Sequence, residues 1–269
     1  MKRSSPTPRR LTRCLASHVF LIGLMTGQSG ASGTVPESAV SPTLVGQSQS
    51  FGASLYKRTS DSVVVIFGFD DNGRGVAAAG FFVGSAGAIL THRDNLIDPQ
   101  TENAWPHLVA YLKPTELTGT HRQDLTTPFS VEVQQIDDSL DLALVRLSNL
   151  MTLRPILEFE CTAPIEIGTP IMTIGHGPKG QWTTTTGIVN SRLLDEGKNL
   201  LLSKANLNPG SPGAPVMNEE GCVVGMLSGQ RKDSDGRAIF NLNLDLQTRE
   251  VRTWLAKVDV IQSTRPSLY

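Results

Sequence analysis

The chain has 269 residues, of which 39% are hydrophobic and 18% are charged, and its formal net charge at pH 7 is −1. This composition supplies enough apolar surface for a folded core and excludes a disordered, collagenous or coiled-coil chain. Five of the 24 basic residues lie in the first thirteen positions, so the rest of the chain is acidic and has no lysine or arginine run that would bind nucleic acid.

The first 33 residues have the three parts of a secretory signal peptide. Basic residues between Lys2 and Arg13 precede an apolar run, Cys14–Met25, and small residues follow as far as Gly33. Cleavage after Ala31 or Gly33 fits this pattern, and the mature protein is then expected to be secreted or periplasmic, with no stable membrane span. The alternative is an uncleaved membrane anchor, but the apolar run is shorter than the ~20 residues that a spanning helix needs.

The next residues, 34–50, are polar and rich in Pro and Ser, which predicts a flexible linker. After them, short runs rich in Val, Ile, Phe and Thr are separated by Gly, Asp, Asn and Pro, a pattern typical of all-β barrels and sandwiches. Two groups of six strands are expected, at Ser62–Phe69, Val76–Val83, Ala88–Thr91, Leu108–Leu112, Ser130–Asp137 and Leu142–Leu147, and at Pro170–Ile174, Thr183–Val189, Leu200–Ser203, Pro215–Met217, Cys222–Ser228 and Ala238–Leu242. One helix is expected near the end, where Leu246, Val251, Trp254 and Leu255 share a face.

These elements predict an all-β fold of two six-stranded antiparallel β-barrels with a C-terminal helix. We expect the N-terminal barrel in residues 51–150, the C-terminal barrel and the helix in residues 151–258, and a tail in residues 259–269. The segment 98–129 is longer than a strand connection requires, which predicts a surface excursion.

The sequence offers little for metal or cofactor binding. Cys161 and Cys222, the two cysteines outside the leader, form either a disulfide in an oxidising compartment or two buried thiols. They lack the paired spacing of a zinc site. His92 and Asp94 place two ligand types close together, but two ligands do not define a site, so no metal and no cofactor are expected.

Four segments occur in an informative order: Gly80–Thr91 (GFFVGSAGAILT), Asp141–Leu147 (DLALVRL), Gly168–Gly175 (GTPIMTIG) with Thr186–Val189 (TGIV), and Asn208–Asn218 (NPGSPGAPVMN). Together they resemble trypsin-like serine proteases, especially the HtrA/Deg branch. The last segment is similar, without a gap, to the loop NPGNSGGPLVN around the nucleophile of that family. The resemblance runs from about Ser54 to Leu255 and implies the double-barrel protease fold without the PDZ module of that branch.

The same resemblance implies that the catalytic residues have changed. Asp94 stands where the family has its general-base histidine, and a carboxylate with a pKa several units lower transfers protons poorly at neutral pH. Pro212, at the nucleophile position, has neither a hydroxyl to attack a carbonyl nor a backbone N–H for the oxyanion hole. Asp141 keeps the position of the orienting aspartate, and Gly210 keeps that of an oxyanion-hole donor.

We therefore expect an exported, catalytically inactive homologue that binds a peptide or protein, with Ile239–Leu242 at the family's substrate-binding strand. The alternative is an active serine endopeptidase that uses Ser211 and His92 as displaced nucleophile and base. A one-residue shift along an extended segment turns a side chain to the opposite face, which argues against it. Members of this branch often assemble through N-terminal segments, so Phe51 and Tyr56 either hold a homo-oligomer together or pack on their own barrel.

Overall fold

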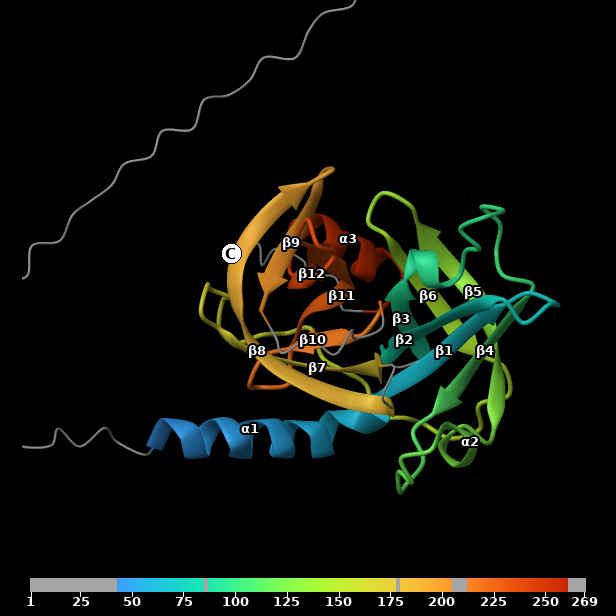
Figure 1. Ribbon diagram of the computed structural model, residues 1–269, viewed down its shortest axis with the longest axis horizontal. Coiled ribbons are helices and arrows are strands. Elements are labelled where there is room, and N and C mark those ends of the chain that lie inside the picture. Colours follow the sequence, from blue (N-terminus) through green and yellow to red (C-terminus); the bar gives the residue numbers. More distant parts are fainter. Residues whose placement is uncertain (1–42, 85–86, 178–179, 205–211, 261–269) are drawn as a thin grey trace, which may run out of the picture. The chain divides into compact units, whose positions relative to one another are not determined.

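In the part of the chain that the structure describes, twelve strands form two closed antiparallel barrels of six strands each (Figure 1). The structure is a computed structural model and describes residues 43–84, 87–177, 180–204 and 212–260, all of which belong to one compact unit of the chain. The strand orders are β1-β2-β3-β6-β5-β4 and β10-β11-β12-β9-β8-β7. The predicted fold, two barrels followed by a helix, is confirmed.

The strands lie where the sequence predicted them, with small differences at their ends. The first barrel consists of β1 (Val63–Phe69), β2 (Gly75–Val83), β3 (Ala88–His92), β4 (His107–Leu112), β5 (Pro128–Asp137) and β6 (Leu142–Leu147). The second consists of β7 (Pro170–Gly177), β8 (Gly180–Asp195), β9 (Lys198–Ser203), β10 (Pro215–Met217), β11 (Val223–Lys232) and β12 (Ala238–Asp245). The largest difference is in β8, which continues past Val189 because its pairing with β9 extends as far as Asp195 and Lys198.

Within the described ranges, three helices accompany the barrels: α1 (Thr43–Thr59), α2 (His121–Asp124) and α3 (Arg249–Lys257), with single 3₁₀ turns η1 (Ser60–Ser62) and η2 (Arg93–Asn95). The helix predicted near the end is α3, and its side chains Val251, Trp254 and Leu255 are buried as expected. No helix in the described ranges is long and apolar enough to cross a membrane.

Helix α1 was not predicted, and its first turns fall in the segment 34–50 that was predicted to be a linker. The helix is held by contacts with the second barrel rather than by strong local preference. Leu55 is fully buried, and the hydroxyl of Tyr56 donates a hydrogen bond of 2.9 Å to the carbonyl of Trp182 on β8. Phe51 and Tyr56 pack against the chain's own core, which is one of the two alternatives that the sequence left open.

The continuous hydrophobic runs are explained by two cores that share strands. On β1, Val64 and Ile66 point into the interior of the first barrel, whereas Val63 and Val65 belong to the core between the barrels. Because neighbouring side chains of a strand face opposite sides, both faces of β1 are buried. The indole Nε1–H of Trp182 donates to the carbonyl of Val63 at 2.7 Å and thereby joins the second barrel to the first.

Two local features complete the fold. Cys161, in the connector between the barrels, forms a disulfide with Cys222, which lies immediately before β11. The segment 98–129 contains β4 and α2, and its first turn is anchored by Asp98, whose buried carboxylate accepts two hydrogen bonds, of 2.8 and 2.7 Å, from Arg74.

Candidate active site

The positions that correspond to the family's triad lie at the meeting of the two barrels. β3 ends at His92, and the 3₁₀ turn η2 that follows carries Asp94. The Asp94 side chain is 65% exposed, and its carboxylate accepts a hydrogen bond of 2.9 Å from Arg93. We refer to His92, Asp94, Asp141 and Pro212 together as the remnant site.

His92 is buried, with 4% of the residue exposed. Its Nδ1 accepts the backbone N–H of Asp94 at 3.3 Å, and its Nε2 lies 4.0 Å from Oδ2 of Asp141. Burial lowers the pKa of His92, an effect that the carboxylates of Asp94 and Asp141 oppose. The imidazole is therefore neutral at neutral pH, and its single proton is on Nε2 because Nδ1 is an acceptor.

Asp141 occupies the turn before β6, with a φ of 54°. Its carbonyl accepts the N–H of Arg93 at 2.9 Å, which fixes the turn against η2. Its carboxylate forms an ion pair with the ammonium group of Lys198, the first residue of β9. A histidine at 4.0 Å is outside hydrogen-bonding range, so the partner of this carboxylate is a lysine.

Pro212 is fixed by its carbonyl group. That oxygen accepts hydrogen bonds of 3.0 Å from the N–H of Ala79 and from Nδ2 of Asn95. Asn95 also donates to the hydroxyl of Thr91 at 2.8 Å, and Thr91 donates to the carbonyl of Ala79 at 2.7 Å. The loop of the second barrel that contains Pro212 is thus tied to β2, β3 and η2 of the first.

Sequence reasoning missed Lys198 and Asn95. Lys198 is 57 positions from Asp141, and Asn95 is 117 positions from Pro212, so only the folded barrels bring them together. Gly210 and Ser211 lie outside the described residues, and their roles as oxyanion-hole donor and displaced nucleophile stay predictions.

The described residues contain no group of three or more His, Cys, Asp and Glu side chains that could hold a metal ion. His92 and Asp94 do lie together, with Nδ1 and Oδ2 4.0 Å apart. Nδ1 already accepts a backbone N–H, and the described part of the chain adds no third ligand.

The sequence placed the substrate-binding strand at Ile239–Leu242, and the structure contradicts this for its last two residues. Asn241 and Leu242 of β12 pair with β11 on one side and with β9 on the other, so a peptide cannot add to either edge there. An edge is available on β11 instead. Its pairing with β10 ends at Met226, and among the described residues the segment Ser228–Lys232 pairs with β12 alone.

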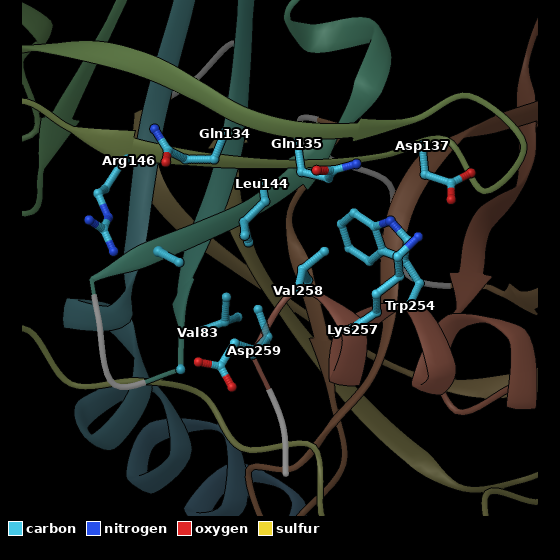
Figure 2. Close-up of a pocket in the computed structure, with 13 residues that line it drawn as sticks. Val83, Gln134, Gln135, Asp137, Leu144, Arg146, Trp254, Lys257, Val258 and Asp259 are labelled. Carbon is cyan, nitrogen blue, oxygen red and sulfur yellow. The ribbon is translucent and has the colours of Figure 1, made fainter. Parts of the chain in front are cut away.

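A pocket of about 400 Å³ lies elsewhere, between the first barrel and α3. Figure 2 shows Leu144 and Gln135 of the barrel on one side of it and Trp254 and Lys257 of the helix on the other. No residue of the remnant site is among the described residues that line it. The pocket is therefore separate from the positions that correspond to the triad.

Comparisons with known proteins agree with this fold. The family model described as "Trypsin-like peptidase domain" matches residues 78–226. "Putative serine protease HhoA" of Synechocystis sp. is 23% identical over 186 residues, which cover 66% of this chain and 42% of that protein. "Serine protease HTRA1B" of Danio rerio is 27% identical over 215 residues, 74% of this chain and 40% of that protein. The chain thus matches less than half the length of each of these relatives.

Among solved structures, "Crystal structure of Rv3671c protease from M. tuberculosis, active form" is similar, with a TM-score of 0.59 and 21% sequence identity. The match covers 89% of this chain and 96% of that one. It shows the same fold.

Proposed function

The chain belongs to the trypsin-like peptidase domain family, and we propose that it is an exported member that binds extended peptide segments without hydrolysing them. The observation that carries the proposal is the position of Pro212. Its carbonyl is held by Ala79 and Asn95 at the point where the family has its nucleophile. Peptide hydrolysis by this family needs a hydroxyl there, and proline has none.

The other positions of the catalytic machinery are also arranged in ways that do not support catalysis. Pro212 cannot supply the backbone N–H of an oxyanion hole, and the loss of one such donor costs about 10²–10³ in rate even in an intact enzyme. Asp94 turns its carboxylate to solvent and to Arg93. The carboxylate of Asp141 is paired with Lys198 rather than with an imidazole.

The geometry of His92 argues against a displaced triad. A general base needs one ring nitrogen for its orienting carboxylate and the other for the nucleophile. Here Nδ1 accepts the N–H of Asp94, and Nε2 is the nitrogen nearer to Asp141. Nε2 carries the ring proton and Nδ1 already accepts a hydrogen bond, so neither nitrogen can take a proton from Ser211.

The most suitable place for a ligand is the edge of β11 at Ser228–Lys232. An unpaired strand edge presents main-chain N–H and C=O groups to which an extended peptide adds as another strand. Gly229 is the second residue of this edge, and a Cβ built there would have no atom within 4 Å. A peptide backbone can therefore approach closely.

Binding is tested with the purified chain and a panel of fluorescent extended peptides, followed by anisotropy. We expect saturable binding to some of the peptides, and Gly229→Phe is expected to weaken it at least tenfold, because the ring obstructs the edge without displacing other atoms. The matched control is Asp235→Phe, in an exposed turn, which should bind as the wild type does. Absence of binding across the panel, or equal binding by Gly229→Phe, would overturn the proposal.

Export rests on residues 1–33 and has its own test. If the leader is cleaved as its pattern predicts, the exported chain begins at Ser32 or Thr34. N-terminal sequencing of the protein recovered outside the cytoplasm of an expressing cell measures this directly. An intact Met1 in a membrane-bound product would support the anchored alternative instead.

A further inference from the structure

The ion pair between Lys198 and Asp141 connects the two barrels at the remnant site. Lys198 is the first residue of β9 and follows the tight turn that closes the β8–β9 hairpin. Asp141 belongs to the first barrel, in the turn before β6. Their side chains are 24% and 19% exposed, so the pair is largely screened from bulk water.

Charged groups of several elements surround this pair, including Asp245 of β12 and Glu250 of α3, which line a pocket together with Lys198. His92, at the end of β3, has its Nε2 4.0 Å from the Asp141 carboxylate. Arg93 and Asp94 of η2 form an ion pair with each other, and Arg93 also binds Asp138 in the turn that leads to Asp141. Lys198 is the charged group of the second barrel that acts on His92.

We propose that Lys198 is a positioning residue of the remnant site, which holds the carboxylate of Asp141 and keeps it from serving as the partner of an imidazole. This deepens the proposed function and rests on it, because it adds a third change to those at positions 94 and 212. An ammonium group in contact with the carboxylate compensates part of its charge, so the nearby imidazole gains less from the carboxylate than it would without the lysine. The same contact joins the β8–β9 hairpin to the first barrel.

Removal of Lys198 should change the proton affinity of His92. Without the ammonium group, the carboxylate of Asp141 faces His92 alone, and an opposite charge within about 4–6 Å favours the protonated imidazole. The pKa of His92 should then rise. Arginine at position 198 keeps the positive charge and should leave the titration of His92 as it is in the wild type.

The test is an NMR titration of the His92 ring in the full chain, with the resonance assigned from its absence in His92→Gln. We expect the proton affinity of His92 in Lys198→Gln to increase about tenfold, the lower end of the usual effect of an adjacent carboxylate. Lys198→Arg should restore the wild-type titration. Lys257→Gln, an exposed lysine beside the separate pocket, is the matched control and should titrate like the wild type.

An unchanged titration of His92 in a folded Lys198→Gln variant would overturn the proposal, since a lysine that only stabilises the fold would lower stability without altering His92. If Lys198→Gln does not fold, Asp141→Asn provides the second test. It removes the carboxylate but leaves the lysine, so the proton affinity of His92 should fall, and an unchanged value would again contradict the proposal. Neither readout depends on peptide binding or catalysis, so its failure is distinguishable from that of the proposed function.

Discussion

Gly213, next to the remnant site, shows how closely the two barrels meet. Its φ is +89°, and a Cβ placed on it would lie 2.0 Å from the carbonyl oxygen of Ala79 and 2.7 Å from side-chain atoms of Thr91 and Asn95. The contact with Ala79 is with backbone, which cannot move aside as a flexible side chain would. Only glycine fits at this position.

The variant Gly213→Ala should therefore lose about 2–4 kcal/mol of the free energy of unfolding, because strain at a positive φ is combined with a steric clash. Gly236→Ala is the control, since Gly236 also has a positive φ, of +77°, but open space around it. Strain alone should cost it about 1–2 kcal/mol. Urea denaturation of both variants measures the difference, and equal losses would show that the contact with Ala79 does not matter.

His92 makes stability depend on pH. Burial lowers its pKa, and burial together with His121 lowers that of His176. The unfolded chain, whose histidines titrate near pH 6.5, therefore binds protons that the folded chain does not as the pH falls below about 6.5. The stability contributed by the neutral rings is complete above that pH and is lost as the pH falls toward the lowered values.

Urea denaturation between about pH 7.5 and pH 5.5 measures this loss in the wild type and in His92→Gln. The variant should lose less stability on acidification, because the contribution of His92 is gone and that of His176 remains. A pH dependence equal to that of the wild type would show that His92 is not protected from protonation in the folded chain.

At the scale of elements, the strands could be predicted and α1 could not. The runs at Val63–Ile66 and Leu142–Val145 are apolar on both faces and lie between Gly, Asp or Asn residues. This local pattern predicts the strands of a barrel. Helix α1 carries Gly and several Ser residues and has little helical preference of its own. Its stability comes from tertiary contacts, which the local sequence does not reveal.

Docking of α1 can be tested at Leu55, which is fully buried in the core between the barrels. Leu55→Ala should lower the free energy of unfolding by about 2–5 kcal/mol, the usual cost of a cavity at a buried leucine. Calorimetry or urea denaturation gives the value. A loss below about 0.5 kcal/mol, as for a surface substitution, would mean that α1 does not pack on the barrel.

The disulfide also contributes to the stability of the folded chain. It joins Cys161 in the connector to Cys222 before β11, across a sequence separation of 61 residues. Closing a loop of that length restricts the unfolded chain, and Cys161→Ser with Cys222→Ser should cost about 2–5 kcal/mol. Unfolding of the wild type with and without a reductant provides the comparison, and the double variant should be insensitive to the reductant.

At the scale of the whole molecule, the sequence predicts which residues of the remnant site have changed, and the structure shows what those residues contact. The substitutions at positions 94 and 212 could be found from the motifs, because flanking residues such as Thr91 and Gly213 fix the alignment. The contacts of Lys198 with Asp141 and of Asn95 with Pro212 could not be predicted, because each joins the first barrel to the second. The expectation of an open edge at Asn241 and Leu242 failed for the same reason, since only the pairing of the strands shows that these residues have neighbours on both sides.

We propose that this trypsin-like domain does not catalyse peptide hydrolysis. The most direct measurement is reaction of the folded, purified chain with a fluorophosphonate, with mass-spectrometric mapping of any adduct and casein cleavage measured in parallel. We expect no adduct and no cleavage. An adduct on Ser211 or another serine, with turnover that disappears when that serine is changed to alanine, would contradict the proposal and make the protein a working protease.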